Sequence, residues 1–91
     1  MPFYPRAREE HWLRDKHEEG RIVILEDESA WEVHPSDRLV TACWLRMSTI
    51  TVSHTQKEEY PYLLTNTMER ETARAIYLGE SVPGKTTSEV A

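Results

Sequence analysis

The chain of 91 residues has a single cysteine, only three glycines and no long apolar segment. Because one cysteine cannot form an intrachain disulfide, Cys43 excludes a disulfide framework as the source of stability. No apolar run is long enough for a membrane-spanning helix, and the N-terminus lacks the apolar core of a signal peptide. These absences predict a cytoplasmic protein without a membrane partner. A secreted protein whose signal peptide has been removed is the alternative.

Basic residues are also in short supply, since 11 Lys and Arg stand against 16 Asp and Glu and give a net charge of −5. An acidic protein repels phosphate backbones, so the composition predicts no nucleic-acid partner. The sequence has no glycine-rich phosphate loop, no cysteine pair spaced for zinc and no Gly-x-Ser-x-Gly motif. We therefore expect a protein that is not an enzyme and that has no cofactor, catalytic residue or metal site.

What the sequence does contain is a series of β-strand patterns, beginning with residues 21–33. The apolar run Ile22–Leu25 meets an acidic turn at residues 26–28, after which Trp31 and Val33 follow two residues apart. An apolar run, a polar reversal and a period-2 return are typical of a β-hairpin with one buried face. We interpret this hairpin as the folding nucleus of the domain.

Further strand patterns follow along the chain. Residues 49–54 alternate between apolar and hydroxyl side chains, and residues 62–65 and 72–78 predict a second hairpin. Residues 38–45 fit either a strand or a single helical turn. Five short strands within residues 21–78 predict a mainly β fold, a small curled antiparallel sheet or an SH3-like or OB-like barrel. The side chains expected in its core are Ile22, Ile24, Trp31, Val33, Trp44, Ile50, Val52, Leu64 and Ala75.

The two flanks differ from this domain in composition. Residues 1–20 are polar, and Glu, Arg and Ala dominate residues 6–19, which favours a short N-terminal helix ending at Gly20. This segment is expected to form a polar helical arm. Residues 79–91 combine glycine, proline and small polar residues with almost nothing apolar, which predicts a disordered tail.

The order ILEDESAWEV, Asp37, Trp44, TITV, LLTN and ARAIY resembles a group of small bacterial proteins of unknown function. Those proteins share an apolar strand, an acidic turn, a return strand with Trp, a second Trp and a strand ending in Asn. The resemblance covers residues 21–77 and implies a barrel-like sheet, but no reaction and no ligand. Such proteins often have glycine in the acidic turn, where this chain has Glu28, which argues against a tight two-residue turn.

The histidines and the cysteine are the first candidates for chemistry. In a helix, His11 and His17 would point to nearly opposite sides and could not share a metal ion. His34 and His54 lie at strand ends and could approach each other in a closed sheet. Cys43 is expected to be a small buried hydrophobic residue rather than a nucleophile.

The acidic groups and the aromatic residues are the remaining candidates. Residues 26–28 are interpreted as a solvated turn beside an apolar strand, and residues 58–59 form a second acidic pair. Trp31, Trp44 and Tyr62 would form a stacking surface if they faced outward, and the alternative is that they belong to the core. The candidate binding residues are Trp31, Trp44, Tyr62, His34 and His54.

Two functional hypotheses follow from these patterns. The first is a non-enzymatic β domain that acts through contact with a protein partner or through self-association, using an exposed sheet edge. The second is a small-ligand or metal-dependent protein with a pocket between the sheet and the N-terminal helix. His34, His54 and nearby carboxylates would line that pocket.

Overall fold

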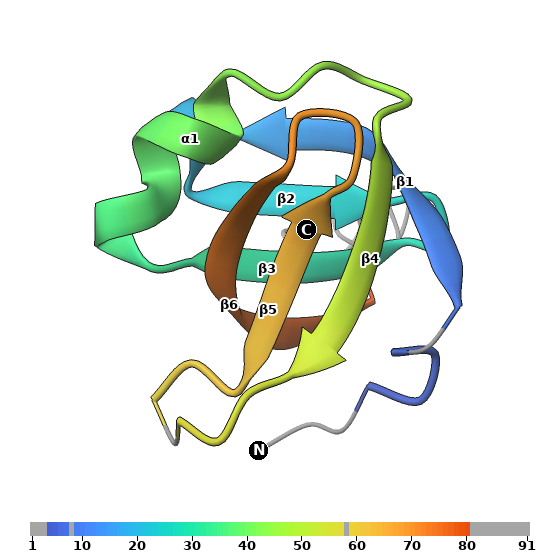
Figure 1. The fold of residues 1–91 in the computed structure, drawn as a ribbon, viewed down its shortest axis with the longest axis vertical. Coiled ribbons are helices and arrows are strands. Elements are labelled where there is room, and N and C mark those ends of the chain that lie inside the picture. Colours follow the sequence, from blue (N-terminus) through green and yellow to red (C-terminus); the bar gives the residue numbers. More distant parts are fainter. Residues whose placement is uncertain (1–3, 8, 58, 81–91) are drawn as a thin grey trace, which may run out of the picture.

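The computed structural model describes residues 4–7, 9–57 and 59–80, which form a closed antiparallel β-barrel (Figure 1). The strands are β1 (Glu10–His17), β2 (Ile22–Leu25), β3 (Ser29–Val33), β4 (Thr49–His54), β5 (Tyr62–Asn66) and β6 (Glu71–Glu80). They follow one another around the barrel in the order β1-β2-β3-β6-β5-β4, and β4 pairs with β1 to close the ring. The predicted small antiparallel barrel is confirmed.

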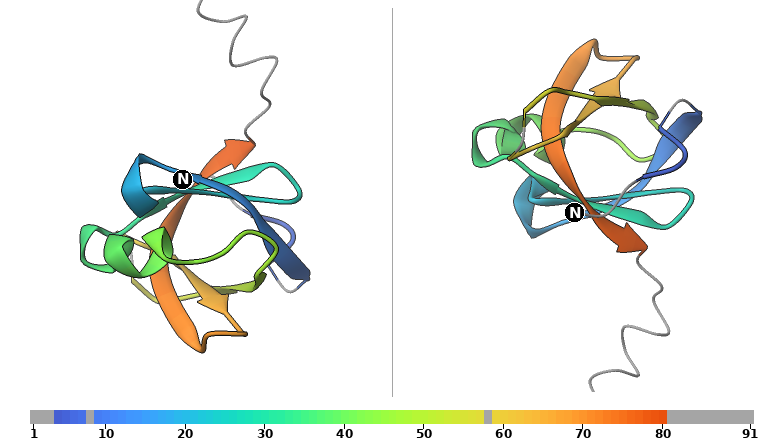
Figure 2. Two further views of the ribbon diagram at one scale, coloured as in Figure 1. Left: turned by 90° about the horizontal axis from the view of Figure 1, so that it is seen from above. Right: turned by 90° about the horizontal axis from the view of Figure 1, so that it is seen from below.

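One short helix, α1 (Arg38–Ala42), connects β3 to β4 and follows a 3₁₀ turn, η2 (Pro35–Asp37). A second 3₁₀ turn, η1 (Glu18–Gly20), joins β1 to β2. Of the two alternatives for residues 38–45, the helical turn is therefore correct. The hydroxyl of the buried Thr41 donates a hydrogen bond of 2.6 Å to the carbonyl oxygen of Gly20 and so holds α1 against η1. Figure 2 views the ring of strands end-on, with α1 on its outer side.

The first hairpin has the predicted strands, β2 and β3, and its loop has three residues, 26–28, which agrees with the argument against a tight two-residue turn. Glu28, the last of them, has a φ of 69°, and its N–H donates to the carbonyl oxygen of Leu25 at 2.9 Å. In the resulting register Val23 lies opposite Trp31, so Val23 and Leu25 face the core. The prediction that Ile22 points into the core is wrong for this reason, since Ile22 is only partly buried. Ile24 is buried as predicted, at 7% exposure, but it lies outside the main core cluster. The other seven predicted core residues do belong to it: Trp31, Val33, Trp44, Ile50, Val52, Leu64 and Ala75.

The predicted N-terminal helix is wrong, because residues 10–17 form strand β1. His11 and Leu13 point into the barrel, while Glu10, Trp12 and Arg14 are exposed, which is the period-2 alternation of a strand. The high helix propensity of this segment is overridden by pairing with β4 at one end and with β2 at the other. The β domain therefore begins with β1 rather than at residue 21.

The second predicted hairpin, β5 with β6, is present, but β6 is longer than expected. Gly79 and Glu80 belong to this strand and pair with Ala30 and Ser29 of β3, so these two residues are not part of a tail. Residues 81–91, the rest of the predicted tail, lie outside the described residues. Within the described part of the chain, no helix is long and apolar enough to cross a membrane.

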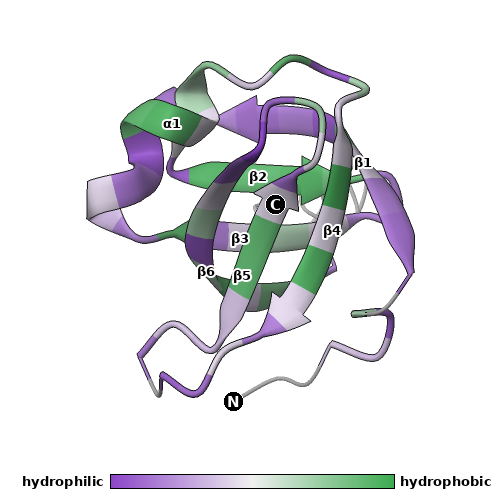
Figure 3. Cartoon of the chain, viewed as in Figure 1, coloured by the Kyte–Doolittle hydropathy of each residue, from purple (hydrophilic) through white to green (hydrophobic). Residues whose placement is uncertain are grey.

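Alternation places apolar side chains inside the barrel, and Figure 3 shows apolar and polar positions following one another along β4 and β5. Cys43 is an exception to the prediction made for it, because it is exposed at the end of α1 rather than packed in the core. The next residue, Trp44, is the one that turns inward. Its indole N–H donates a hydrogen bond of 2.9 Å to the carboxylate of Glu71 at the start of β6.

Candidate functional site

One end of the barrel, which we call the mouth, is filled by the side chain of Tyr4. This residue precedes β1 and is only 1% exposed. Its ring packs at 4.8 Å from Trp31 and 5.0 Å from Tyr77, measured between ring centroids, with large interplanar angles at both contacts. Its backbone N–H donates to the hydroxyl of Tyr62 at 2.9 Å. The N-terminal segment is thereby attached to the barrel through one aromatic side chain.

Polar groups surround the hydroxyl of Tyr4. This hydroxyl lies 2.5 Å from the carboxylate of Asp27 and 3.0 Å from Nε2 of His11. The same Asp27 carboxylate accepts hydrogen bonds from the N–H and the hydroxyl of Ser29, at 3.1 and 2.6 Å. The Ser29 hydroxyl in turn accepts the indole N–H of Trp31 at 2.9 Å. A continuous hydrogen-bond network thus joins the N-terminal segment to the first hairpin and the core.

His11 is buried at the centre of this network, and both of its ring nitrogens face acceptors. Nδ1 lies 2.9 Å from the carboxylate of Glu26, and Nε2 lies 2.9 Å from the carbonyl oxygen of Arg6. A carbonyl oxygen can only accept, so Nε2 carries a proton, and Nδ1 donates to the carboxylate in the same way. His11 is therefore held as an imidazolium between Glu26 and Asp27.

The pKa values of these groups agree with the geometry. Burial alone would lower the pKa of His11, but its hydrogen bonds to Arg6 and Glu26 and the nearby acidic charges raise the pKa above its ordinary value. Burial would raise the pKa of Asp27, yet hydrogen bonds from Ser29 and Tyr4 lower it overall. Burial and the Asp27 carboxylate raise the pKa of Tyr4, which keeps the phenol protonated as a donor.

We expect the free energy of unfolding to be highest in weakly acidic solution and to decrease as the pH rises. The raised pKa of His11 stabilises the fold below its unfolded value of 6.5, and this contribution is lost as the pH rises through the folded pKa. The lowered pKa of Asp27 acts on the other side, because its contribution is lost as the pH falls below 3.8 and through the folded pKa. Urea unfolding over this pH range measures both effects.

The variant His11→Gln should lose the decrease in stability on the alkaline side. His17→Gln is the matched control, because His17 is an exposed histidine on the same strand, 3.7 Å from Asp15. A wild-type protein whose stability does not change between weakly acidic and alkaline solution would contradict the imidazolium assignment.

His11, Glu26 and Asp27 also form the cluster that most resembles a metal site. Their ligand atoms all lie within 4.8 Å of one another. A histidine that binds a metal must offer a free nitrogen lone pair, and here both nitrogens of His11 are used as donors. The arrangement is therefore that of a hydrogen-bonded ion-pair network rather than of a metal centre.

The acidic turn is thus more than a solvated cap. The side chain of Asp27 is only 6% exposed, and Glu26 also accepts the backbone N–H of Trp12 at 3.0 Å. Only Glu28 fits the interpretation made from the sequence, since its side chain is 41% exposed and pairs loosely with Arg14 at 3.7 Å. Of the second acidic pair, Glu58 lies outside the described residues.

The three aromatic candidates for a stacking surface are all in the core. Trp31, Trp44 and Tyr62 are 0%, 1% and 3% exposed, so none of them presents a face to a ligand in solution. They stabilise the barrel, which is the alternative that the sequence left open.

The two candidate histidines are at the surface, each against a tyrosine. The ring of His34 lies 4.7 Å from that of Tyr60, and the ring of His54 lies 4.6 Å from that of Tyr62. Nδ1 of His34 accepts the N–H of Ser36 at 3.0 Å and so caps η2. A structural role therefore occupies this nitrogen of His34.

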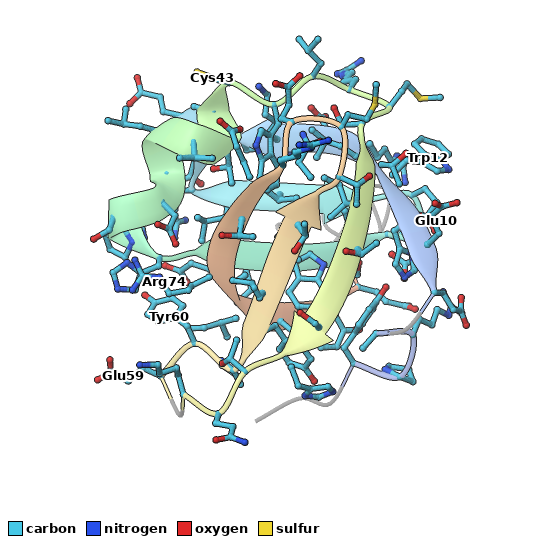
Figure 4. The ribbon with its side chains drawn as sticks, viewed as in Figure 1. Glu10, Trp12, Cys43, Glu59, Tyr60 and Arg74 are labelled. Atoms are coloured by element: carbon cyan, nitrogen blue, oxygen red, sulfur yellow. The ribbon has the colours of Figure 1, made fainter. Side chains whose placement is uncertain are left out.

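Shallow pockets lie beside both histidines. His34 and Tyr60 border one of about 170 Å³ together with Arg74, and Figure 4 shows Tyr60 and Arg74 on the same side of the barrel. The guanidinium of Arg74 donates a hydrogen bond of 3.0 Å to the carboxylate of Asp37. His54 borders a wider surface groove of about 510 Å³ between β4 and the N-terminal segment at Ala7. The sequence predicted one pocket beside an N-terminal helix, lined by both histidines. His34 and His54 instead border separate pockets, and the segment beside His54 is not a helix.

The other end of the barrel carries exposed apolar side chains, and we call it the loop end. It consists of Trp12, Leu45, Met47 and Met68, which are between 40% and 72% exposed. Figure 4 shows Trp12 on the outer side of β1. The N–H of Met47 donates to the carbonyl oxygen of Leu13, next to Trp12, at 2.8 Å.

Backbone hydrogen bonds also hold the β5–β6 turn against this end. The N–H of Thr67 donates to the carbonyl oxygen of Thr49 at 3.0 Å, which places Met68 beside the start of β4. Beneath the turn, the side-chain oxygen of the buried Asn66 accepts the N–H groups of Met68 and Glu69. Its Nδ2 is buried and has no hydrogen-bond partner among the described residues. Three segments distant in sequence thus meet at the loop end.

The sequence patterns did not predict which residues form the mouth or the loop end. Tyr4 lies in a segment without strand periodicity, and His11 counts as polar although it faces the core. Met47 and Met68 lie in loops, where no periodicity marks a side chain as exposed or buried. The chain matches no protein-family model, and no curated protein or solved structure matches it. Its function therefore has to be inferred from its own residues.

Proposed function

We propose that this protein is a non-enzymatic domain that associates with a second copy of itself through the loop end. The observation that supports the proposal is the exposure of four large apolar side chains, Trp12, Leu45, Met47 and Met68, at one end of the barrel. Large apolar side chains exposed on one part of a small domain are typical of sites where proteins bind one another. Methionine and tryptophan are also common in such interfaces, because methionine adapts its shape and tryptophan buries a large area.

The charges around the loop end favour a second copy as the partner. Exposed Arg46 lies in the loop before β4, where it pairs with Asp15 at 3.3 Å. Exposed Glu69 and Arg70 lie in the β5–β6 turn, and exposed Glu71 follows at the start of β6. A surface that combines an apolar centre with both signs of charge is self-complementary about a two-fold axis, because the basic groups of each copy can face the acidic groups of the other. A partner of one charge sign would leave some of these side chains opposite a like charge.

Backbone strain gives separate support for a role of Met47. Its φ of 72° lies in the left-handed region, which costs a residue with a side chain roughly 1–2 kcal/mol. Glycine would occupy this position without strain, and strained residues of this kind are concentrated at functional sites. We interpret Met47 as a residue whose exposed side chain is kept at the expense of stability.

The closed barrel changes how association takes place. Within the described residues β1 pairs with both β2 and β4, so the ring leaves no strand edge for a partner strand. The exposed edge invoked from the sequence is therefore absent from this part of the chain, and contact has to be made by side chains.

We expect Met47→Gly to weaken self-association by about tenfold or more without destabilising the fold. The substitution removes an exposed apolar side chain and relieves the left-handed backbone at the same residue. Sedimentation velocity over a range of concentrations measures the association, and urea unfolding measures the stability.

Glu19→Gly is the matched control, because Glu19 is exposed, has a φ of 57° and lies in η1 rather than at the loop end. It should leave the association constant unchanged. A wild-type protein that stays monomeric at the highest concentrations reached would contradict the proposal, as would equal association by the two variants.

A further inference from the structure

We propose that the mouth is a preformed site for a phenol ring, that Tyr4 is its built-in occupant, and that a free phenol binds there when the Tyr4 side chain is absent. The proposal concerns the end of the barrel opposite the loop end: Tyr62, which contacts Tyr4, begins β5, and Asn66, beneath the loop end, ends it. It therefore does not depend on self-association.

The walls of the mouth fit a single aromatic ring. Trp31, Tyr62 and Tyr77 surround the ring of Tyr4 with centroid distances of 4.8, 6.4 and 5.0 Å and interplanar angles of 79°, 89° and 61°. These edge-to-face contacts come from β3, β5 and β6, so the walls belong to the barrel and not to the segment that carries Tyr4. Such contacts stabilise an aromatic guest beyond the burial of its area.

The inner end of the mouth is specific for a hydroxyl group. Asp27 accepts the Tyr4 hydroxyl at 2.5 Å, and Nε2 of His11 lies 3.0 Å from the same oxygen. A ring without a hydroxyl would leave the buried carboxylate of Asp27 with one hydrogen bond fewer, which disfavours such a ligand strongly. The chemistry therefore selects a phenol over a plain aromatic ring.

The attachment of Tyr4 is local, which makes its replacement feasible. Strand pairing of the N-terminal region begins only at Glu10. Before that residue, the segment is held on the barrel by the hydrogen bonds of Tyr4 and of the Arg6 carbonyl, by an ion pair of 3.5 Å between Arg6 and Asp27 and by the buried side chain of Ala7, as far as the described residues extend. A small cavity of about 50 Å³ adjoins Tyr4 and Asp27 and opens the mouth toward the surface. A small molecule thus has a path to the site once the Tyr4 side chain is absent.

The test uses the full-length variant Tyr4→Ala with p-cresol, which is the side chain of tyrosine as a free molecule. We expect p-cresol to raise the melting temperature of the variant by at least about 4 °C at saturation, and toluene to raise it far less. Wild-type protein should not respond, because its mouth is occupied. If Tyr4→Ala is unfolded in buffer, p-cresol should restore its near-ultraviolet circular dichroism and toluene should not.

The matched control is Tyr60→Ala, which removes a tyrosine that packs on His34 at the surface of the barrel. This variant should not be stabilised by p-cresol. Equal stabilisation of Tyr4→Ala by toluene and p-cresol would show that the mouth is an apolar cavity without selectivity for a hydroxyl group, and would overturn the proposal. The absence of any stabilisation or restored folding by p-cresol would overturn it as well.

Discussion

Replacing Trp31 by alanine is expected to lower the free energy of unfolding by about 3–5 kcal/mol. Trp31 is fully buried, and its ring lies within 5.2 Å of the rings of Tyr4, Tyr62 and Tyr77, measured between centroids. Its removal opens a cavity that these three side chains cannot fill together, since each is held by other contacts. It also leaves the hydroxyl of Ser29 without the indole donor. In a domain of this size, such a loss is a large part of the total stability.

Urea unfolding followed by circular dichroism measures this effect. Trp12→Ala is the matched control, because Trp12 is 40% exposed on the outer side of β1 and should change stability by less than about 1 kcal/mol. A Trp31→Ala protein that unfolds at the same urea concentration as the Trp12→Ala protein would show that the core is not organised around Trp31.

Gly20→Ala is expected to have a comparably large effect, a loss of about 2–5 kcal/mol, from a different cause. Gly20 has a φ of 93°, which a residue with a side chain adopts only under strain. An added Cβ would also overlap the carbonyl oxygen of Arg38 and lie 2.8 Å from the backbone nitrogen of Ala42. Both atoms belong to the backbone of α1, so the helix would have to move away from η1 and lose the hydrogen bond from Thr41.

Gly79→Ala separates the two causes. Gly79 has a φ of 100°, but a Cβ added there would meet nothing within 4 Å. This variant should show the backbone strain alone, a loss of roughly 1–2 kcal/mol. If both glycine variants lose the same stability in urea unfolding, the close contact between Gly20 and α1 does not stabilise the fold.

Much of the barrel could be predicted from the sequence, because its strands alternate in the ordinary way. Ile50 and Val52 in β4 point inward as expected, and the hairpin of β5 and β6 places Ala75 in the core. The alternation fails where all residues of a strand are apolar, as in Ile22–Leu25. There the three-residue loop decides which face is buried, and the sequence pattern alone does not determine the loop length.

Strand β1 was missed because a polar residue takes a core position. His11 faces the barrel between the exposed residues Glu10 and Trp12. A pattern that counts histidine as polar and tryptophan as apolar therefore assigns the buried face of the strand to the wrong residues. The partners that make this burial possible, Glu26 and the Arg6 carbonyl, are distant or carry no side-chain signal. Buried polar networks of this kind depend on tertiary contacts, which local propensity does not contain.

The candidate site was harder to predict than the fold. The sequence indicated Trp31, Trp44 and Tyr62 as potential binding residues, since aromatic side chains are common in both cores and interfaces. All three are buried. The exposed apolar residues instead include Met47 and Met68, which lie in loops, where burial depends on which segments the barrel brings together.

The two ends of the barrel are thus specialised in different ways. The mouth is closed by Tyr4 and a polar network around His11, and it stabilises the fold in weakly acidic solution. The loop end leaves Met47 and Met68 exposed, with strain in the backbone of Met47. The proposed self-association would explain why a strained residue with an apolar side chain occupies this position.

The most direct test of self-association follows the methyl groups of Met47 and Met68 by NMR as the protein concentration is raised. Both side chains are more than 60% exposed in the single chain, so their ε-methyl resonances should shift or broaden when two loop ends meet. The buried methyl groups of Ile50 serve as the internal reference. Methionine resonances that change with concentration while those of Ile50 stay constant are the result we predict. Methionine resonances that do not depend on concentration would contradict the account.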